Sequence, residues 1–274
     1  MNLRLILLID FSKYSETVLK LADAWGQRLN AQLLLVHQVT PVLPGMIDVE
    51  TKRELLEAEK ENALQKLRAL AARFVTAPLA TEYMVTDQHL TSTVSDLTLQ
   101  PFQHMVIMGL KGAGFFKKFF IGSTASSILE DVNVLTVAVP EELNDPLPDK
   151  LVVALHAKKE LNENAFDFFL QKFTTEIQQL EFISVNKPDE PEPENKVYLE
   201  KVTETYRADF TVNYSVFTDE DAAHGIEKHM AALGNDSFLV VQKGPRSVSD
   251  KLFRSFLIDE LLNECAFPMI ILPE

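Results

Sequence analysis

Glycine and hydroxyl residues are concentrated in one short part of the sequence, in a pattern suited to holding phosphate. The chain has 274 residues but only nine glycines, and four of these fall within fourteen residues. The residues that could carry this chemistry are Gly109, Gly112, Gly114, Gly122, Ser123 and Thr124. Glycine has no side chain to keep main-chain amides away from an anion. The free amides and hydroxyl groups of a helix's first turn point toward the same anion. The cluster therefore predicts a phosphate-binding loop.

A buried strand before the cluster and a helix after it would hold these groups in place. The apolar run at residues 104–108 is typical of a parallel strand buried on both faces. Gly109 follows it directly, at the strand end that opens toward the ligand crevice of an open α/β sheet. Ser123–Asp131 is expected to be a helix that begins just after Gly122. The pattern differs from a Walker loop, and it lies too far from the first strand for a dinucleotide fingerprint.

Strands and helices alternate throughout the first half of the chain. Apolar runs of strand length predict strands at residues 3–9, 32–39, 80–85, 104–108 and 134–139. Helical spacing of apolar residues predicts helices at 15–29, 49–74, 91–99 and 123–131. This alternation is typical of a doubly wound, Rossmann-like α/β domain with a mainly parallel five-stranded sheet.

The second half repeats this order, so the chain is expected to hold two tandem α/β domains, residues 1–146 and 147–274. Strands are expected at 151–155, 180–185, 210–216, 237–241 and 267–272, and the aromatic run at 166–173 is expected to be a core helix. VLTVAVP at 134–140 aligns with FPMIILP at 267–273, which indicates an internal duplication with an offset of 133 residues.

Composition excludes several classes of protein. A single cysteine, Cys265, cannot form an intramolecular disulfide, and it is expected to be a buried packing residue. The apolar runs are far shorter than the roughly 20 residues that span a membrane. A net charge of −14 argues against general nucleic-acid binding. The sequence therefore predicts a cytoplasmic protein that binds neither membranes nor nucleic acid.

The spacing Gly109, two residues, Gly112, nine residues, Gly122, Ser123 resembles that of the universal stress protein family, in the branch that binds ATP. IDFS at 9–12, LLLVHQV at 33–39 and the last strand of the first half agree with this resemblance, which covers the whole first half. It implies a protein of the stress response, in which bound ATP alters conformation or a partner-binding surface.

The resemblance also implies which residues bind the nucleotide. Asp10 would approach the adenine or ribose, and the main chain at His37 and Gln38 would recognise the base. Gln38 replaces a hydrophobic residue common in the family, but recognition by the main chain survives that change. Ribose and phosphates would be held by Gly109, Gly112, Gly122, Ser123 and Thr124. Mg²⁺ would accompany the triphosphate, although the sequence offers no evident metal ligand.

The second half lacks the matching pattern. With the offset of 133, the three spaced glycines fall against Gln242, Pro245 and Ser255, and Ser123 falls against Phe256. Proline has no amide to donate to phosphate, and phenylalanine puts bulk in place of a hydroxyl. His156 stands near the position of Asp10. The first half carries a charge of −4 and the second −10, so we expect one ATP per chain, in the first domain only.

Other groups of residues point to no separate chemistry. The acidic, proline-rich segment 187–195 is expected to be a solvated loop. His224 and His229 are expected to be an ordinary surface pair. No catalytic residue is identified, so at most slow ATP hydrolysis is expected. Two alternatives stay open, namely a nucleotide-free interaction scaffold and an ATP-hydrolysing or adenylyl-transferring enzyme on the same fold.

The resemblance implies contacts between the two halves of the chain as well as contacts with other molecules. Paired domains of the family associate through their terminal strands, so 134–139 and 267–272 would pair antiparallel within one chain and make it a pseudo-dimer. The sequence leaves open whether two chains form a homodimer, and it does not identify the protein partner.

Overall fold

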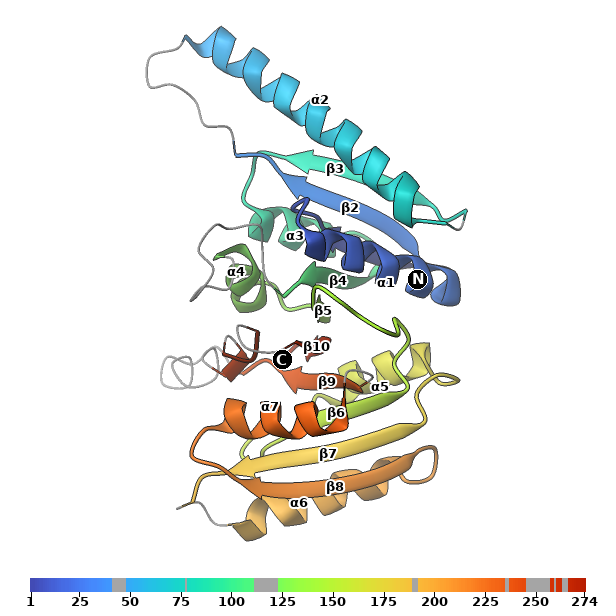
Figure 1. Ribbon diagram of the computed structural model, residues 1–274, viewed down its shortest axis with the longest axis vertical. Coiled ribbons are helices and arrows are strands. Elements are labelled where there is room, and N and C mark those ends of the chain that lie inside the picture. The colour runs from blue at the N-terminus through green and yellow to red at the C-terminus, as the bar shows by residue number, and fades with distance from the viewer. Residues whose placement is uncertain are drawn as a thin grey trace.

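Strands and helices alternate through most of each half of the chain (Figure 1). The computed structural model describes residues 1–274 except 41–47, 77, 111–122, 189–191, 235–236, 245–256, 259 and 263–265. The first half contains β1 Leu3–Leu8, α1 Lys13–Leu29, β2 Gln32–Gln38, α2 Val49–Phe74, β3 Thr81–Thr86, α3 Leu90–Thr98, β4 Gln103–Gly109, α4 Ser123–Asp131 and β5 Thr136–Val139. The second contains β6 Lys150–Ala154, α5 Glu163–Lys172, β7 Gln179–Asn186, α6 Glu192–Tyr206, β8 Thr211–Thr218, α7 Ala222–Leu233, β9 Ser237–Gln242 and β10 Met269–Leu272.

All of these strands form one ten-stranded sheet in the order β3-β2-β1-β4-β5-β10-β9-β6-β7-β8. Within each half the neighbouring strands are parallel. β5 and β10 meet antiparallel at the centre, with Ile270 opposite Val137, which confirms the expected pairing of the terminal strands. The strand order reverses direction between β1 and β4 and again between β6 and β9. Ligands of doubly wound sheets bind at such switch points, beyond the carboxyl ends of the strands.

Helices cover both faces of the sheet, as the alternating sequence predicts. One buried apolar cluster joins the sheet to α1, α2, α5 and α6, and the other joins it to α3, α4 and α7. Strand residues alternate between the two clusters: Leu5 and Leu7 belong to the first, and Ile6 and Leu8 to the second. This alternation explains the unbroken apolar runs, because both sides of each central strand are buried.

A buried aromatic cluster joins the two halves beside the central strands. Trp25 of α1 is fully buried, and its ring centroid lies 4.6 Å from that of Phe173 and 5.9 Å from that of Phe169. The ring of Phe238 in β9 stacks on the same indole at 6.4 Å. The indole Nε1 donates to the carbonyl of Pro146, 2.6 Å away in the connection between the halves. The expected core role of the aromatic helix is confirmed, since Phe166, Phe169 and Phe173 are all fully buried.

The prediction of a solvated loop over 187–195 is wrong for its last residues. α6 begins at Glu192, and Asn195 is only 3% exposed. The Oδ1 atom of Asn195 accepts from the main-chain N–H of Ala157 at 2.6 Å, and its Nδ2 donates to Asn186. Pro193 is compatible with the helix because first-turn amides have no partner within the helix.

One of the two histidines of α7 differs from the predicted surface pair. His224 is exposed and lies 3.0 Å from the carboxylate of Asp219. The side chain of His229 is only 17% exposed, and its Nε2 lies 3.0 Å from Glu181 Oε1. Glu181 also pairs with Lys150 at 2.7 Å. His229 therefore lies beside the largely buried ion pair of Glu181 and Lys150, at the contact of α7 with β7 and β6.

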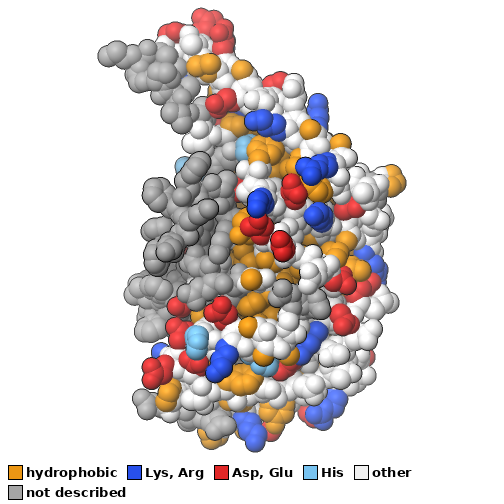
Figure 2. All heavy atoms as spheres, viewed as in Figure 1, with side chains coloured by type: hydrophobic (Ala, Val, Ile, Leu, Met, Phe, Trp, Pro, Cys, Tyr) orange, Lys and Arg blue, Asp and Glu red, His pale blue; other side chains and the backbone are white. Residues whose placement is uncertain are grey.

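Charged side chains of both signs are interspersed on the face shown in Figure 2. Over the described part of that face, Lys and Arg lie among Asp and Glu and no broad patch of one sign is visible.

Candidate functional site

The carboxyl ends of β1, β2 and β4 bring several of the predicted site residues to one edge of the sheet. These strands are parallel neighbours in the order β2-β1-β4. Asp10 follows β1, His37 and Gln38 end β2, and Gly109 ends β4. Asp10 and Gly109 thus flank the switch point between β1 and β4, where the sheet opens a crevice.

Asp10 organises the turn from β1 into α1. Its Oδ1 accepts hydrogen bonds from the main-chain N–H of Ser12 at 2.9 Å, the Ser12 hydroxyl at 2.6 Å and the Ser15 hydroxyl at 2.9 Å. An acid in this position also complements the partial positive charge at the start of the helix. The residue is exposed beside this switch point, so its structural role at the start of the helix is compatible with contact to a ligand.

His37 fixes the end of β2 against the end of β1. Its Nδ1 donates to the carbonyl oxygen of Ile9 at 2.7 Å, and its ring packs on Phe11 with centroids 4.4 Å apart. Burial lowers the pKa of His37, and the hydrogen bond to Ile9 and the charge of Asp10 only partly oppose that effect. The imidazole is therefore neutral at pH 7, and its role in the structure is to position the strand ends.

This lowered pKa makes the stability of the protein depend on pH. As the pH falls below about 6.5, the usual histidine pKa, unfolded His37 gains a proton before folded His37 does. The folded state therefore loses stability as the pH falls further, until the pH is below the folded-state pKa of His37. We expect His37→Asn, which can still donate to Ile9, to lose less stability than the natural chain between pH 7.5 and 5.5 in urea unfolding. Equal losses in the two proteins would contradict this role.

The main chain at Gln38 faces the space beyond the end of β1. Residues of a parallel strand direct their N–H and C=O groups alternately to the two neighbouring strands. Val39 N–H bonds to Thr86 of β3, and the Val36 carbonyl accepts from Ile9 beyond β1. Gln38 therefore faces the β1 side, two residues beyond the last β1–β2 pair at Val36. These main-chain groups could offer one donor and one acceptor to a ligand on that side.

The backbone conformation at Gly109 does not require a glycine. It pairs with Val139 in a regular parallel ladder, and its φ lies outside the left-handed region. A glycine in a strand forgoes packing and often marks close approach of a ligand or another backbone. Its place at the switch point is compatible with close approach of a ligand.

The rest of the predicted loop is only partly within the described structure. Gly112 and Gly122 lie outside the described residues. Ser123 and Thr124 form the first residues of α4, as predicted, but their side chains lie outside the described part. The structure thus places Asp10, His37, Gln38 and Gly109 at one edge, and the start of α4 follows β4 in the chain.

Three residues near this edge, Phe11, Lys66 and Arg73, were not among the predicted site residues. Phe11 has φ +60°, a left-handed conformation that is rare for a bulky side chain and is concentrated at functional sites. Together with Lys66 and Arg73 of α2, it lines a shallow groove beside the site. The sequence shows Phe11 beside Asp10, but neither its backbone angle nor the approach of α2 can be read from local spacing.

Neither a metal centre nor a membrane span is evident in the described structure. Among the described residues, no three His, Cys, Asp or Glu side chains are grouped so that they could hold a metal ion. Within the same residues, no helix combines the length and the apolar character needed to cross a bilayer.

The second switch point is built differently. Gln242 ends β9, the position that Gly109 holds in β4, and its side chain is held on both sides. Its Oε1 accepts from the Asn162 N–H at 2.7 Å, and its Nε2 donates to the Glu160 carbonyl at 3.3 Å. His156 follows β6 as Asp10 follows β1. Pro245, Ser255 and Phe256 lie outside the described residues.

Solved structures similar to this one share its fold over almost the whole chain. A universal stress protein from Archaeoglobus fulgidus DSM 4304 matches with a TM-score of 0.71 and 15% identity, covering 98% of each chain. A functionally unknown protein from Pseudomonas aeruginosa PAO1 matches at 0.57 and 12%, covering 100% of this chain and 93% of its own. A putative universal stress protein from Pseudomonas aeruginosa UCBPP-PA14 gives the same score and identity, covering 99% and 93%. These likenesses show the fold.

Sequence comparison identifies the family itself. No curated protein matches the chain in sequence. The model of the universal stress protein family matches residues 1–140, a segment that holds β1 to β5 and every predicted nucleotide-site residue. The chain belongs to the universal stress protein family.

Proposed function

We propose that the first half binds one ATP in the crevice between β1 and β4, and that the bound nucleotide regulates a stress response by changing a surface that a protein partner recognises. The observation that carries the proposal is Gly109, a glycine in extended backbone at the switch point. The strand loses packing by having no side chain there. A phosphate held close to the main chain accounts for that loss.

The residues at the crevice suit the separate parts of a nucleotide. The Gln38 main chain faces the position for the base, and exposed Asp10 can accept from a ribose hydroxyl. The loop after Gly109 and the start of α4 would hold the phosphates, with Gly112, Gly122, Ser123 and Thr124 supplying amides and hydroxyls. In this arrangement each contact to the nucleotide is made by a main-chain group or a short polar side chain near the end of a strand or the start of a helix.

Mg²⁺ fits this site as a companion of the phosphates. Since the described residues offer no group of three metal-ligating side chains, phosphate oxygens and water would supply most of its ligands, as Mg²⁺ commonly prefers. The ion would neutralise part of the phosphate charge. The first half has a net charge of −4 and would repel a phosphate only weakly.

Regulation, in preference to catalysis, is the role this site supports. The Asp10 carboxylate already accepts three hydrogen bonds through Oδ1, and His37 donates to Ile9. Both groups therefore position the strand ends, and neither is presented as a general base. A nucleotide can still shift a conformational equilibrium if it binds one state more tightly than the other.

Equilibrium titration with ATP and Mg²⁺ tests the proposal. One ATP per chain is expected, with binding saturable by calorimetry and with ATP or ADP detected by mass spectrometry in the purified protein. Two equivalent sites would contradict the restriction to the first half. Reproducible absence of bound nucleotide together with no affinity on titration would instead favour a nucleotide-free scaffold.

A further inference from the structure

The first half has an open groove between α2 and the turn that follows β1. It is lined by Phe11 of that turn and by Lys66, Ala69, Leu70 and Arg73 of α2, and its volume is about 460 Å³. Only these two elements form its walls, whereas a cofactor pocket encloses most of its ligand. An open groove along a helix instead suits a peptide segment of another protein.

The equivalent place in the second half is held closed by hydrogen bonds. Ala157 stands where Phe11 stands in the first half, and its N–H donates to Asn195 Oδ1 of α6 at 2.6 Å. The Leu161 N–H donates to the Tyr198 hydroxyl of the same helix at 2.7 Å. The turn after β6 is thus bound directly to α6, where in the first half a groove separates the turn from the helix.

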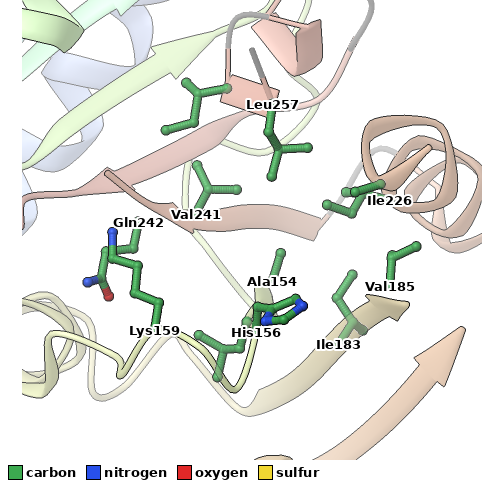
Figure 3. Close-up of a pocket in the computed structure, with 12 residues that line it drawn as sticks. Ala154, His156, Lys159, Ile183, Val185, Ile226, Val241, Gln242 and Leu257 are labelled. Carbon is green, nitrogen blue, oxygen red and sulfur yellow. The ribbon is translucent and has the colours of Figure 1, made fainter. Parts of the chain in front are cut away.

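A cavity of the second half is not the counterpart of this groove. It measures about 110 Å³ and is lined mainly by aliphatic side chains of β7, α7 and β9, among them Ile183, Ile226 and Val241 (Figure 3). These residues belong to the apolar cluster on the side of the sheet that α7 covers. The groove lies on the other side of the sheet, along α2, and it is much larger.

The floor of the groove is apolar, and part of it has an unusual backbone conformation. The Phe11 ring is half-buried and packs on the His37 ring, with centroids 4.4 Å apart. Its backbone has φ +60°, which glycine adopts without strain but a bulky side chain rarely does. Ala69 is exposed and Leu70 half-buried. An apolar side chain of a partner would remove this surface from water, which favours binding.

Both charged side chains that line the groove are basic. Lys66 and Arg73 are exposed, and among the described residues no acid lines the groove. Arg73 reaches Glu16 of α1 at 3.7 Å, but the two side chains are 69% and 39% exposed, and such surface pairs contribute little. Lys66 is close enough to His37 for its charge to lower the pKa of that imidazole. In a chain of net charge −14, this local excess of base favours an acidic partner segment.

We propose that the groove binds an acidic segment of the partner protein, with an apolar side chain against Phe11 and carboxylates facing Lys66 and Arg73. The inference rests on the proposed function for its link to ATP, because Phe11 directly follows Asp10, which would contact the ribose. Asp10 Oδ1 holds the turn through the N–H and hydroxyl of Ser12, so a nucleotide that changes the contacts of Asp10 also acts on Phe11. The groove is then the surface whose affinity for the partner depends on the nucleotide.

A labelled peptide, Asp-Asp-Leu-Leu-Asp-Asp, tests the groove on the full chain without nucleotide. Fluorescence anisotropy should show saturable binding, about tenfold tighter than that of matched peptides with Gln in place of Asp or Ala in place of Leu. The net charge of the protein repels every acidic peptide, so any preference for carboxylates must come from local groups. Added salt should weaken the binding. Equal affinity for the three peptides would overturn the proposal.

Two pairs of variants locate the peptide. Ala69→Glu puts an acid in the groove at an exposed helical position that tolerates glutamate, and it should weaken binding about tenfold or more. Ala58→Glu, on nearly the same face of α2 but about 16 Å earlier along the helix, should change it by less than about twofold. Lys66→Gln should weaken binding about fivefold, whereas Arg68→Gln, which removes the same charge outside the groove lining, should not. Unchanged affinity in a folded Ala69→Glu protein, or equal effects within either pair, would overturn the proposal.

ATP separates this inference from the proposed function. In protein that binds ATP by calorimetry, saturating ATP and Mg²⁺ should change the peptide affinity at least about threefold, and the peptide should change ATP affinity by the same factor. Unchanged peptide affinity in such protein would overturn the link between groove and nucleotide. If calorimetry shows no ATP binding, the proposed function fails on that titration, while the peptides and variants still decide whether the groove binds an acidic segment.

Discussion

Replacing Trp25 with alanine is expected to lower the free energy of unfolding by about 3–5 kcal/mol, the usual cost of deleting a fully buried tryptophan. The indole is completely buried and contacts rings from both α5 and β9. Its removal also leaves the Pro146 carbonyl without the hydrogen bond from Nε1. Because α1 belongs to the first half and these rings to the second, the loss should weaken the contact between the halves. Urea unfolding followed by circular dichroism measures the change.

The matched control for this substitution is Trp25→Phe. A phenyl ring keeps much of the contact with Phe173 but cannot donate to Pro146, so we expect a smaller loss than in the alanine variant. The lost hydrogen bond accounts for about 1 kcal/mol of it. If the halves unfold independently, Trp25→Ala should also broaden the transition or split it in two. A loss below about 1 kcal/mol for Trp25→Ala would show that the aromatic cluster contributes little to joining the halves.

The alternating order of strands and helices could be predicted because its signals are local. The helix Val49–Phe74 has the predicted bounds, since Asp48 supplies an N-cap whose side chain accepts from Thr51 and the periodic pattern continues to Phe74. The two similar apolar runs, each ending in proline, indicate the duplication, whereas the antiparallel pairing of β5 with β10 was expected from the family resemblance.

The predictions for the second half were wrong where contacts between residues distant in the sequence outweigh the local composition. Prolines and acids made 187–195 look like a loop, but Pro193 fits a first helical turn and Asn195 is buried against Ala157 and Asn186. Sequence spacing predicts no helix at the positions of α6 or α7. His229 lies near Glu181, 48 positions earlier in the chain, a proximity that no helical spacing reveals.

The candidate site was predictable to the extent that it depends on strand ends. Asp10, His37, Gln38 and Gly109 follow or end parallel strands, so topology brings them to one edge of the sheet. The left-handed conformation of Phe11 and the approach of Lys66 depend on tertiary packing. The small cavity of the second half also depends on tertiary packing, because its wall combines residues from four separate elements.

Gly109→Val is expected to abolish or strongly reduce ATP binding while leaving the protein folded. Valine suits extended backbone in a strand, and the regular pairing of Gly109 with Val139 leaves the ladder intact. The added methyl groups would occupy the crevice where phosphate must approach the main chain. Losing contacts of this kind costs about 2–3 kcal/mol, which corresponds to a roughly 30- to 150-fold weaker affinity. Calorimetric titration with ATP and Mg²⁺ measures it.

The matched control is Gln242→Val, because Gln242 ends β9 at the position equivalent to Gly109 in β4. It should leave ATP affinity unchanged if nucleotide binds only in the first half, although the lost bonds to Asn162 and Glu160 reduce stability. Weakening by Gly109→Val alone would assign the nucleotide to the switch point between β1 and β4. Equal weakening by both variants would indicate a site in each half. A folded Gly109→Val protein with natural ATP affinity would mean that the glycine is present for some reason other than a ligand, and the proposed site would have to be abandoned.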